Sequence, residues 1–210
     1  MATVITHFYN EAKLLPFWLQ HHTKMFENGI LIDHHSTDDS VEICRRLAPH
    51  WTVVQTKLKK FHAIDTDFEV MSYENGISGW KMVLNVTEFL HFPHFSEYLT
   101  QAQARGSMVI CTRGVVMVDD QPGQELRSDL PLIAQKHYGF IEKKSCRKRF
   151  NTRYTTFQKG QPIRFAARER IIHRYPIGAY KPGRHTTFHP VDERPQNAFT
   201  LWYGYSPWVN

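Results

Sequence analysis

The first forty residues alternate strand-like and helix-like patterns, and this order restricts the folds that the chain can adopt. Residues 4–9 and residues 29–33 are apolar runs with strand-forming side chains. Between them, Pro16 can open a helix at its first turn, and apolar residues then recur at helical spacing. Strand, helix and strand in this order are typical of an α/β protein. The sequence therefore predicts an α/β fold with a central mixed, mostly parallel sheet flanked by helices.

The same alternation continues along the chain and becomes weaker beyond residue 129. Asp67 can cap a helix, Gly106 can close one, and Gly114 can interrupt a strand. We expect strands at 51–54, 80–84, 107–111, 115–118 and 169–173, and helices at 41–47, 67–77, 96–105 and 130–137.

Composition indicates a globular protein without a membrane span. Of the 210 residues 41% are hydrophobic and 22% charged, and no stretch approaches the roughly 20 apolar residues that a membrane helix needs. The N-terminus lacks the basic and apolar regions of a signal peptide. Cys44, Cys111 and Cys146 are far apart and have no metal-binding spacing. We expect one domain over residues 1–210 in a reducing, cytoplasmic setting.

The net charge of +6 is concentrated in one segment. Residues 142–174 hold eleven Lys or Arg and two Glu. Such a segment attracts polyanions or phosphorylated ligands, and it can equally be a solvated basic face. Because Phe150 and Tyr154 are interleaved with the cations, a nucleic-acid-binding module is an alternative function. That alternative leaves the first 95 residues unexplained.

Polar residues follow the first two predicted strands. Asn10-Glu11 comes after the first strand, and the acidic turn at residues 33–40 comes after the second. In open α/β sheets, ligands bind at the carboxyl ends of the strands. The sequence therefore predicts a ligand site formed by these two segments.

These segments resemble a known family. Asn10-Glu11 with Leu15, Trp18 and Leu19, followed by Ile-Asp-His-His-Ser-Thr-Asp-Asp-Ser at 32–40, resembles the opening of GT-A glycosyltransferases of the family 2 type. Residues 80–90 are similar to a further segment of that family. The resemblance covers roughly the first 95 residues well and the rest loosely. The whole chain also resembles glycosyltransferase domains encoded by large chlorella viruses, which are modules of longer capsid-glycan enzymes.

The resemblance implies a fold and an activity. It implies a single GT-A domain in which residues 1–95 bind the nucleotide and residues 96–210 the acceptor, with this domain as the N-terminal module of a longer chain. The implied reaction moves a sugar from UDP-glucose, or from a UDP-deoxyhexose such as UDP-rhamnose, to a hydroxyl of a glycan, with Mn²⁺ or Mg²⁺. A viral capsid glycoprotein would be the acceptor, made in the host cytoplasm, and neither nucleic acid nor membrane is an expected partner.

A uracil ring offers one N–H donor between two carbonyl acceptors, so its pocket needs an acceptor, donors and an aromatic or apolar face. Asp33 is the candidate acceptor, and Asn10 either fixes the loop or reaches the ribose. Alternatively, Asp33 and Asp38 are turn and cap residues and Phe8 belongs to the core. The residues expected to bind the nucleotide are Thr6, His7, Phe8, Asn10, Asp33, His34, Asp65, Lys181 and Arg184.

The metal site departs from the family pattern. The family usually has a D-x-D motif at the end of the fourth strand, where this chain has Asn85-Val86-Thr87 followed by Glu88. A literal D-x-D occurs at Asp65-Thr66-Asp67, although helix capping is the simpler role of Asp67. Some enzymes of the GT-A type use a histidine near the C-terminus as a metal ligand, and His185 resembles that residue. The candidate metal ligands are Asn85, Thr87, Glu88, Asp67 and His185.

The catalytic base is the least constrained part of the site. If the transfer inverts the configuration, a carboxylate must reach the acceptor hydroxyl. Asp119 and Asp120 follow a predicted strand, and Glu88 is their competitor. Asp119-Asp120 can also be a surface turn, and a retaining transfer needs no such base. A metal-dependent hydrolase ranks third, because no His and carboxylate set has ligand spacing.

Overall fold

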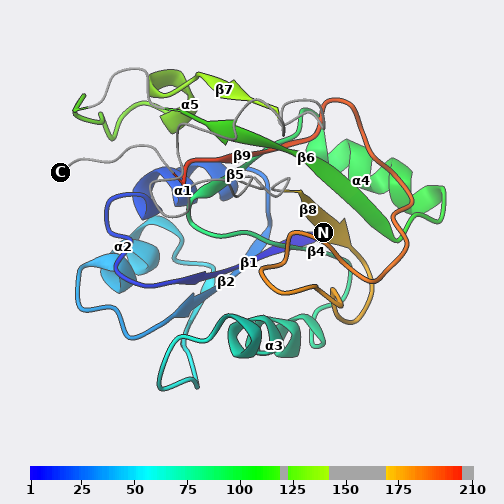
Figure 1. The fold of residues 1–210 in the computed structure, drawn as a ribbon, viewed down its shortest axis with the longest axis horizontal. Helices are drawn as coiled ribbons and strands as arrows, with labels where there is room; N and C mark the ends of the chain where they lie inside the picture. The colour runs from blue at the N-terminus through cyan, green and yellow to red at the C-terminus, as the bar shows by residue number, and fades with distance from the viewer. Residues whose placement is uncertain (119–122, 142–168, 205–210) are drawn as a thin grey trace, which may run out of the picture.

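The computed structural model describes residues 1–118, 123–141 and 169–204. In these residues nine strands form one sheet in the order β3-β2-β1-β4-β8-β6-β9-β5, with β7 paired to β6 (Figure 1). The elements are β1 Ala2–Phe8, α1 Leu15–His22, β2 Asn28–Asp33, α2 Ser40–Leu47, β3 Thr52–Gln55, α3 Ala63–Glu74, β4 Trp80–Val83, β5 Glu88–His91, α4 Phe95–Ala104, β6 Val109–Met117, α5 Leu132–Gln135, β7 Gly139–Phe140, β8 Arg170–His173 and β9 Phe199–Trp202.

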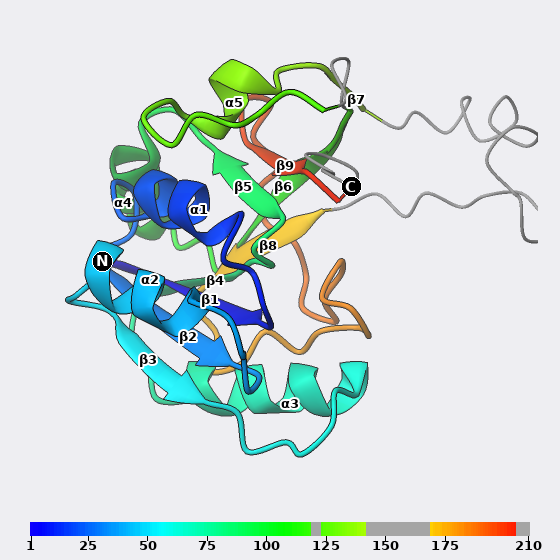
Figure 2. The same cartoon turned by 90° about the vertical axis from the view of Figure 1, so that its left-hand side faces the viewer.

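The first half of the chain forms the parallel part of the sheet. Strand β1 pairs in parallel with β2 and β4, and β2 pairs in parallel with β3. The side chains of successive β1 residues point to opposite faces of the sheet, as in any pleated strand. Val4 packs in the core cluster that contains Trp18 of α1, and Ile5 packs in the cluster that contains Val70 of α3. Figure 2 accordingly shows α1 and α2 on one side of these strands and α3 on the other.

The second half extends the sheet with mixed pairing. Strand β8 lies antiparallel between β4 and β6, so it joins the two halves of the chain. Strand β9 lies between β6 and β5, parallel to the former and antiparallel to the latter. This mixed sheet with flanking helices confirms the predicted α/β class.

Two predicted boundaries are wrong. The predicted break at Gly114 does not occur, because β6 is continuous and changes its partner there: Thr112 pairs with Arg170 of β8, and Gly114 with Thr200 of β9. Helix α3 begins at Ala63, four residues before its predicted start. Asp67 therefore lies inside the helix and is not its cap.

Other predictions fall partly outside the described ranges. Helix α5 is shorter than the predicted helix at 130–137. Cys44 and Cys111 are buried free thiols. Cys146, Asp119, Asp120 and residues 142–168 of the basic segment lie outside the described residues. Among the helices of the described ranges, none combines the length and apolar character needed to cross a bilayer.

Candidate active site

A cavity of about 590 Å³ lies at the carboxyl ends of β1 and β4, against the first turns of α3. Strand β1 and the residues after it supply one wall, and the loop between β4 and β5 supplies another. A late loop at residues 183–185 closes a further side. The lining residues are His7, Phe8, Tyr9, Glu11, His34, Phe61, Ala63, Thr66, Asp67, Asn85, Val86, Thr87, Gly183, Arg184 and His185.

Hydrogen bonds fix the two loops at the ends of β1 and β2 to each other. The Asn10 carboxamide oxygen accepts from Thr37 N at 2.8 Å, and Asn10 N donates to the Ser36 hydroxyl at 3.0 Å. Asn10 and His35 have φ angles of 51° and 59°, in the left-handed region. Of the two roles predicted for Asn10, the structure shows the loop-fixing one.

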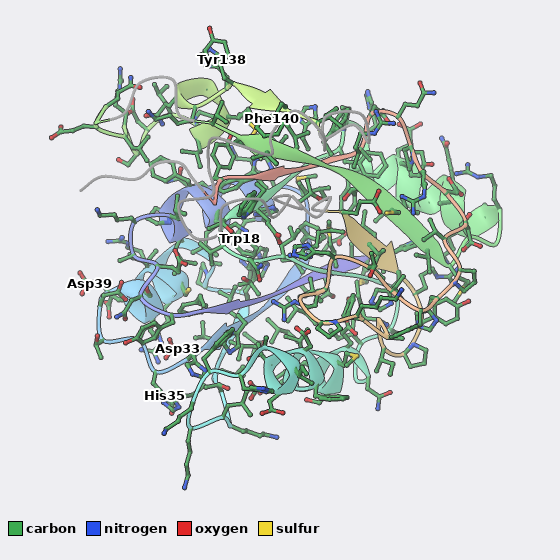
Figure 3. The ribbon with its side chains drawn as sticks, in the orientation of Figure 1. Trp18, Asp33, His35, Asp39, Tyr138 and Phe140 are labelled. Carbon is green, nitrogen blue, oxygen red and sulfur yellow. The ribbon has the colours of Figure 1, made fainter. Side chains whose placement is uncertain are left out.

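Asp33 stabilises the turn that follows β2. It is buried, and its Oδ1 accepts from Ser36 N at 3.0 Å. Figure 3 shows Asp33 and His35 at the end of β2, beside the loop that leads into α3, where His35 Nε2 lies 3.2 Å from the Leu58 carbonyl oxygen. Asp33 is not among the lining residues, so these contacts give it the turn role that the sequence left open as an alternative.

Aromatic rings gather at one end of the cavity. The His7 and His34 rings lie 5.1 Å apart between centroids, and Phe61 lies 6.3 and 6.1 Å from them. Phe61 is 66% exposed and Tyr9 54% exposed, which is unusual for such large rings unless a ligand or partner covers them. Both were missed from the sequence. The signal for Phe61 was an aromatic residue in the cationic stretch Lys59-Lys60-Phe61-His62.

Several buried polar atoms of this cavity have no hydrogen-bond partner in the described residues. They are His7 Nε2, His34 Nδ1, Thr66 Oγ1 and Arg184 Nε. The buried hydroxyl of Thr6, the residue before His7, also has no partner there. More than nine tenths of buried polar groups in proteins are bonded, so this cluster of exceptions calls for a further partner, either water or a polar ligand. Burial, followed by the nearby His34 and Arg184, lowers the pKa of His7 to about 4, so its ring is neutral at pH 7.

An ion pair spans the cavity floor between α3 and the late loop. Asp67 Oδ1 accepts from Arg184 Nη1, and its Oδ2 accepts from Gly183 N at 2.9 Å. The second nitrogen, Arg184 Nη2, donates to Asn85 Oδ1 at 2.8 Å. Both charged side chains are buried. The Arg184 guanidinium thus binds both Asp67, the last residue of Asp65-Thr66-Asp67, and Asn85, the first residue of Asn85-Val86-Thr87.

A second guanidinium holds Glu88 and His185. Arg170 and Glu88 are buried almost completely and form a two-point ion pair, with N–O distances of 2.8 and 2.5 Å. Arg170 Nη1 also contacts His185 Nδ1 at 2.7 Å. Because a guanidinium can only donate, Nδ1 accepts and the ring proton of neutral His185 is on Nε2. Glu88 is not among the lining residues, so this geometry places it as a support of Arg170 and not as a base at the reacting atoms.

The predicted metal ligands, in this arrangement, do not fit a divalent cation. Asp67, Asn85, Thr87 and His185 do line one cavity, but guanidinium groups bind Asp67, Asn85, Glu88 and His185. Within the described residues, no group of three His, Cys, Asp or Glu side chains could hold a metal ion. Guanidinium groups therefore already bind four of the five candidate ligands of Mg²⁺ or Mn²⁺, all except Thr87.

Thr6, Asn10 and Asp33 are not among the lining residues, and two further predicted nucleotide ligands also lie away from the cavity. The exposed Asp65 carboxylate lies 3.1 Å from the His62 ring at the start of α3. The Lys181 ammonium lies 5.2 Å from the Phe188 ring centroid. Neither residue lines the cavity.

Glu11 is a titratable residue of the cavity that the predicted site omitted, although it is part of the Asn-Glu pair. Burial, and then the charge of Asp38, raise the pKa of its carboxyl to about 7. A carboxylic acid in a cleft with a pKa near neutrality is typical of functional sites. With Asp67 bound to Arg184, Glu11 is the acidic lining residue that is not in an ion pair in the described structure.

Comparisons with known proteins give only partial structural likenesses. No family model and no curated protein matches the chain. Staphylococcus aureus TarS 1–349 in complex with UDP is 14% identical over 59% of this chain, with a TM-score of 0.45. Glucosyl-3-phosphoglycerate synthase from Mycobacterium tuberculosis, in complex with Mn²⁺, UDP and glucosyl-3-phosphoglycerate, is 13% identical over 54%, with a TM-score of 0.41. The matched part spans 38% and 44% of those chains.

Proposed function

We propose that the chain is a GT-A type glycosyltransferase that binds a UDP-sugar in this cavity and transfers the sugar to a hydroxyl group. The observation that carries the proposal is the pairing of unsatisfied buried polar atoms and exposed aromatic rings at one end with Arg184 and His185 at the other. A volume of about 590 Å³ lies within the usual range for small-molecule sites, about 300–1,000 Å³.

The aromatic end suits the nucleobase. A planar base can stack against Phe61 or Tyr9 and gain apolar contact, while the neutral imidazole of His7 can donate or accept one hydrogen bond. His34 Nδ1, which has no partner in the part of the chain that the structure describes, can bond to the base or the ribose. These groups supply the mixed donors and acceptors that uracil requires.

The cationic end suits the diphosphate. Arg184 and His185 line the cavity together with the Asn85 and Thr87 segment. A guanidinium is a preferred partner of phosphate oxygens, and charge-assisted bonds of this type are about twice as strong as neutral ones. The leaving diphosphate gains negative charge as the sugar departs, so these donors act in the transition state as well as in binding.

Glu11 is a further candidate for the base that accepts the proton of the acceptor hydroxyl, beside the predicted Asp119 and Asp120. A general base works best with a pKa near the working pH, which the value of about 7 provides. The donor sugar, the glycan acceptor, a role in viral capsid glycosylation, dependence on Mn²⁺ or Mg²⁺ and the cytoplasmic location stay predictions from the sequence.

The proposal predicts selective binding of UDP. Thermal unfolding should shift upward with UDP and not with GDP or CMP, because a ligand that binds only the native state stabilises it. Phe61→Ala should weaken UDP binding about 5- to 50-fold, since base stacking is worth about 1–3 kcal/mol. Phe68→Ala is the matched control, because Phe68 is equally exposed on α3 and does not line the cavity.

Two results would overturn the proposal. One is an equal response, or none, to the three nucleotides. The other is equal weakening of UDP binding by Phe61→Ala and Phe68→Ala, which would place the nucleotide away from the aromatic end of the cavity. Binding of oligonucleotides that is indifferent to UDP would instead favour the nucleic-acid-binding alternative.

A further inference from the structure

We infer that the diphosphate of the donor is bound, and its departure assisted, by the Arg184 guanidinium with His185 beside it, in the place where a divalent cation would otherwise act. The inference rests on the proposed function and specifies how that site holds its substrate. It departs from the sequence expectation of Mn²⁺ or Mg²⁺.

Arg184 already makes the contacts that a bridging cation would make. Its guanidinium binds Asp67 of the literal D-x-D on α3 and also Asn85, which follows β4 at the position where the family motif would begin. Both Asp67 and Arg184 are buried, so their attraction is screened little by water. A divalent cation could reach these oxygens only by displacing Arg184 or by adding two charges beside it.

The late loop is shaped to hold Arg184 in this position. Arg184 has a φ of 59° and the preceding Gly183 a φ of 84°. A left-handed conformation is unfavourable for a non-glycine residue, so surrounding contacts must maintain it. Gly183 N donates to Asp67, and the Gly183 carbonyl accepts from Arg170 Nη1 at 3.1 Å. Strain maintained in this way is typical of ligand-binding positions.

The bonding of the Arg184 guanidinium is incomplete within the described residues. Its Nε is buried without a hydrogen-bond partner there, and the residue lines the cavity. Leaving a buried charged donor unbonded is costly. A phosphate oxygen in the cavity would be charge-matched to the guanidinium of this lining residue.

His185 extends the same anion-binding surface. The contact from Arg170 to Nδ1 places the imidazole proton on Nε2, which is the form that donates to an oxygen and not the form that binds a metal through Nε2. Arg170 is itself held by Glu88 inside the protein. Arg170 and Glu88 are therefore positioning residues that orient His185.

The transfer balances without a metal ion. The bond between the anomeric carbon and the β-phosphate oxygen breaks, and its electron pair stays on that oxygen, which Arg184 stabilises. The acceptor oxygen forms the new bond to the anomeric carbon. The proton of that hydroxyl passes to a carboxylate base or, in a retaining transfer, to the leaving diphosphate.

Calorimetry of the wild-type protein tests the inference without any substitution. UDP should bind with the same affinity, within about twofold, in EDTA and in millimolar Mn²⁺, and uridine should bind at least tenfold more weakly than UDP in EDTA. Binding of UDP only with Mn²⁺ would overturn the inference and leave the proposed function intact. Failure of UDP to bind in either buffer would overturn the proposed function itself.

Substitution of Arg184 locates the effect. Arg184→Gln should weaken UDP about 10- to 100-fold and leave uridine binding unchanged, because a hydrogen bond between charged groups is worth about 1.5–3 kcal/mol and uridine has no diphosphate. Arg194→Gln is the matched control, since it removes an ion-paired arginine outside the cavity. Equal losses for UDP and uridine, or no loss for either, would contradict the role of Arg184.

Discussion

At the residue scale, the cavity concentrates groups whose charge or bonding departs from the usual state. His7 is held neutral by burial, Arg184 Nε has no hydrogen-bond partner among the described residues, and Glu11 has a carboxyl pKa of about 7. Such departures cost folding free energy, and proteins commonly maintain them where they bind or react with ligands. Glu11 allows this cost to be measured directly.

Glu11→Gln should stabilise the protein at pH 8 and have little effect near pH 4.5. The pKa of Glu11 is raised in the folded state, so the unfolded chain ionises first as the pH rises above 4.5, and stability is lost up to and through pH 7. After a discount for partial exposure, the gain at pH 8 should be about 1–2 kcal/mol. Urea unfolding of both proteins at the two pH values measures it.

Asp65→Asn is the control, because this exposed carboxylate contacts the His62 ring outside the cavity. It should change stability at pH 8 by less than about 0.5 kcal/mol. If Glu11→Gln has the same effect at both pH values, the raised pKa is wrong. If Glu11 is also the base, Glu11→Gln should keep UDP binding and lower the rate of transfer.

Part of the site was predictable from single residues. His7, Phe8 and His34 were found because polar and aromatic residues at the ends of predicted strands follow from strand order alone. The ion pairs were not, because Asp67 and Arg184 are 117 residues apart, and Glu88 and Arg170 are 82 apart. Sequence spacing carries no information on such contacts when a single chain is considered.

At the element scale, helix α3 holds residues 178–185, the segment that ends in the late loop. Glu74 at the end of α3 accepts from Gly178 N at 2.6 Å and from the Tyr180 hydroxyl at 2.5 Å, and it lies 3.1 Å from His173 Nε2 of β8. Glu74 is fully buried, and Asp67 anchors the same loop about two turns earlier on the helix. The helix therefore fixes the loop that carries Arg184.

Glu74→Ala should destabilise the protein by about 2–4 kcal/mol, because it leaves buried donors without a partner. It should also raise amide hydrogen exchange in residues 178–187 more than in β1, as expected when a loop loses its anchor. Glu97→Ala on the exposed face of α4 is the control and should cost less than about 0.5 kcal/mol. Equal stability of Glu74→Ala and Glu97→Ala would contradict the anchoring role.

Elements with strong local patterns were predicted well, and those set by distant pairing were not. Strands β1 and β2 and helix α1 follow from apolar runs and Pro16. The continuous β6 depends on β8 and β9 pairing with its two halves, which no local pattern at Gly114 indicates. The capping signal at Asp67 was misleading, because the contact with Arg184 explains that residue instead.

At the scale of the whole molecule, the sheet brings both ends of the described chain to one site. Residues that follow β1 and β4 meet the late loop because β8 returns antiparallel beside β4. The division into a nucleotide half at 1–95 and an acceptor half at 96–210 stays a prediction. The cavity draws on both halves, since Gly183, Arg184 and His185 line it together with His7 and Phe8.

A crystal structure of the protein with UDP, grown with Mn²⁺ present, tests the central claim most directly. We predict that the base stacks against Phe61 or Tyr9. The diphosphate oxygens should lie within about 3.2 Å of Arg184, the typical limit for such hydrogen bonds. The contact between Arg184 and Asp67 should be retained. A metal ion between Asp67 or Asn85 and the diphosphate, with Arg184 displaced, would contradict the role of Arg184. UDP bound outside this cavity would contradict the proposed site as a whole.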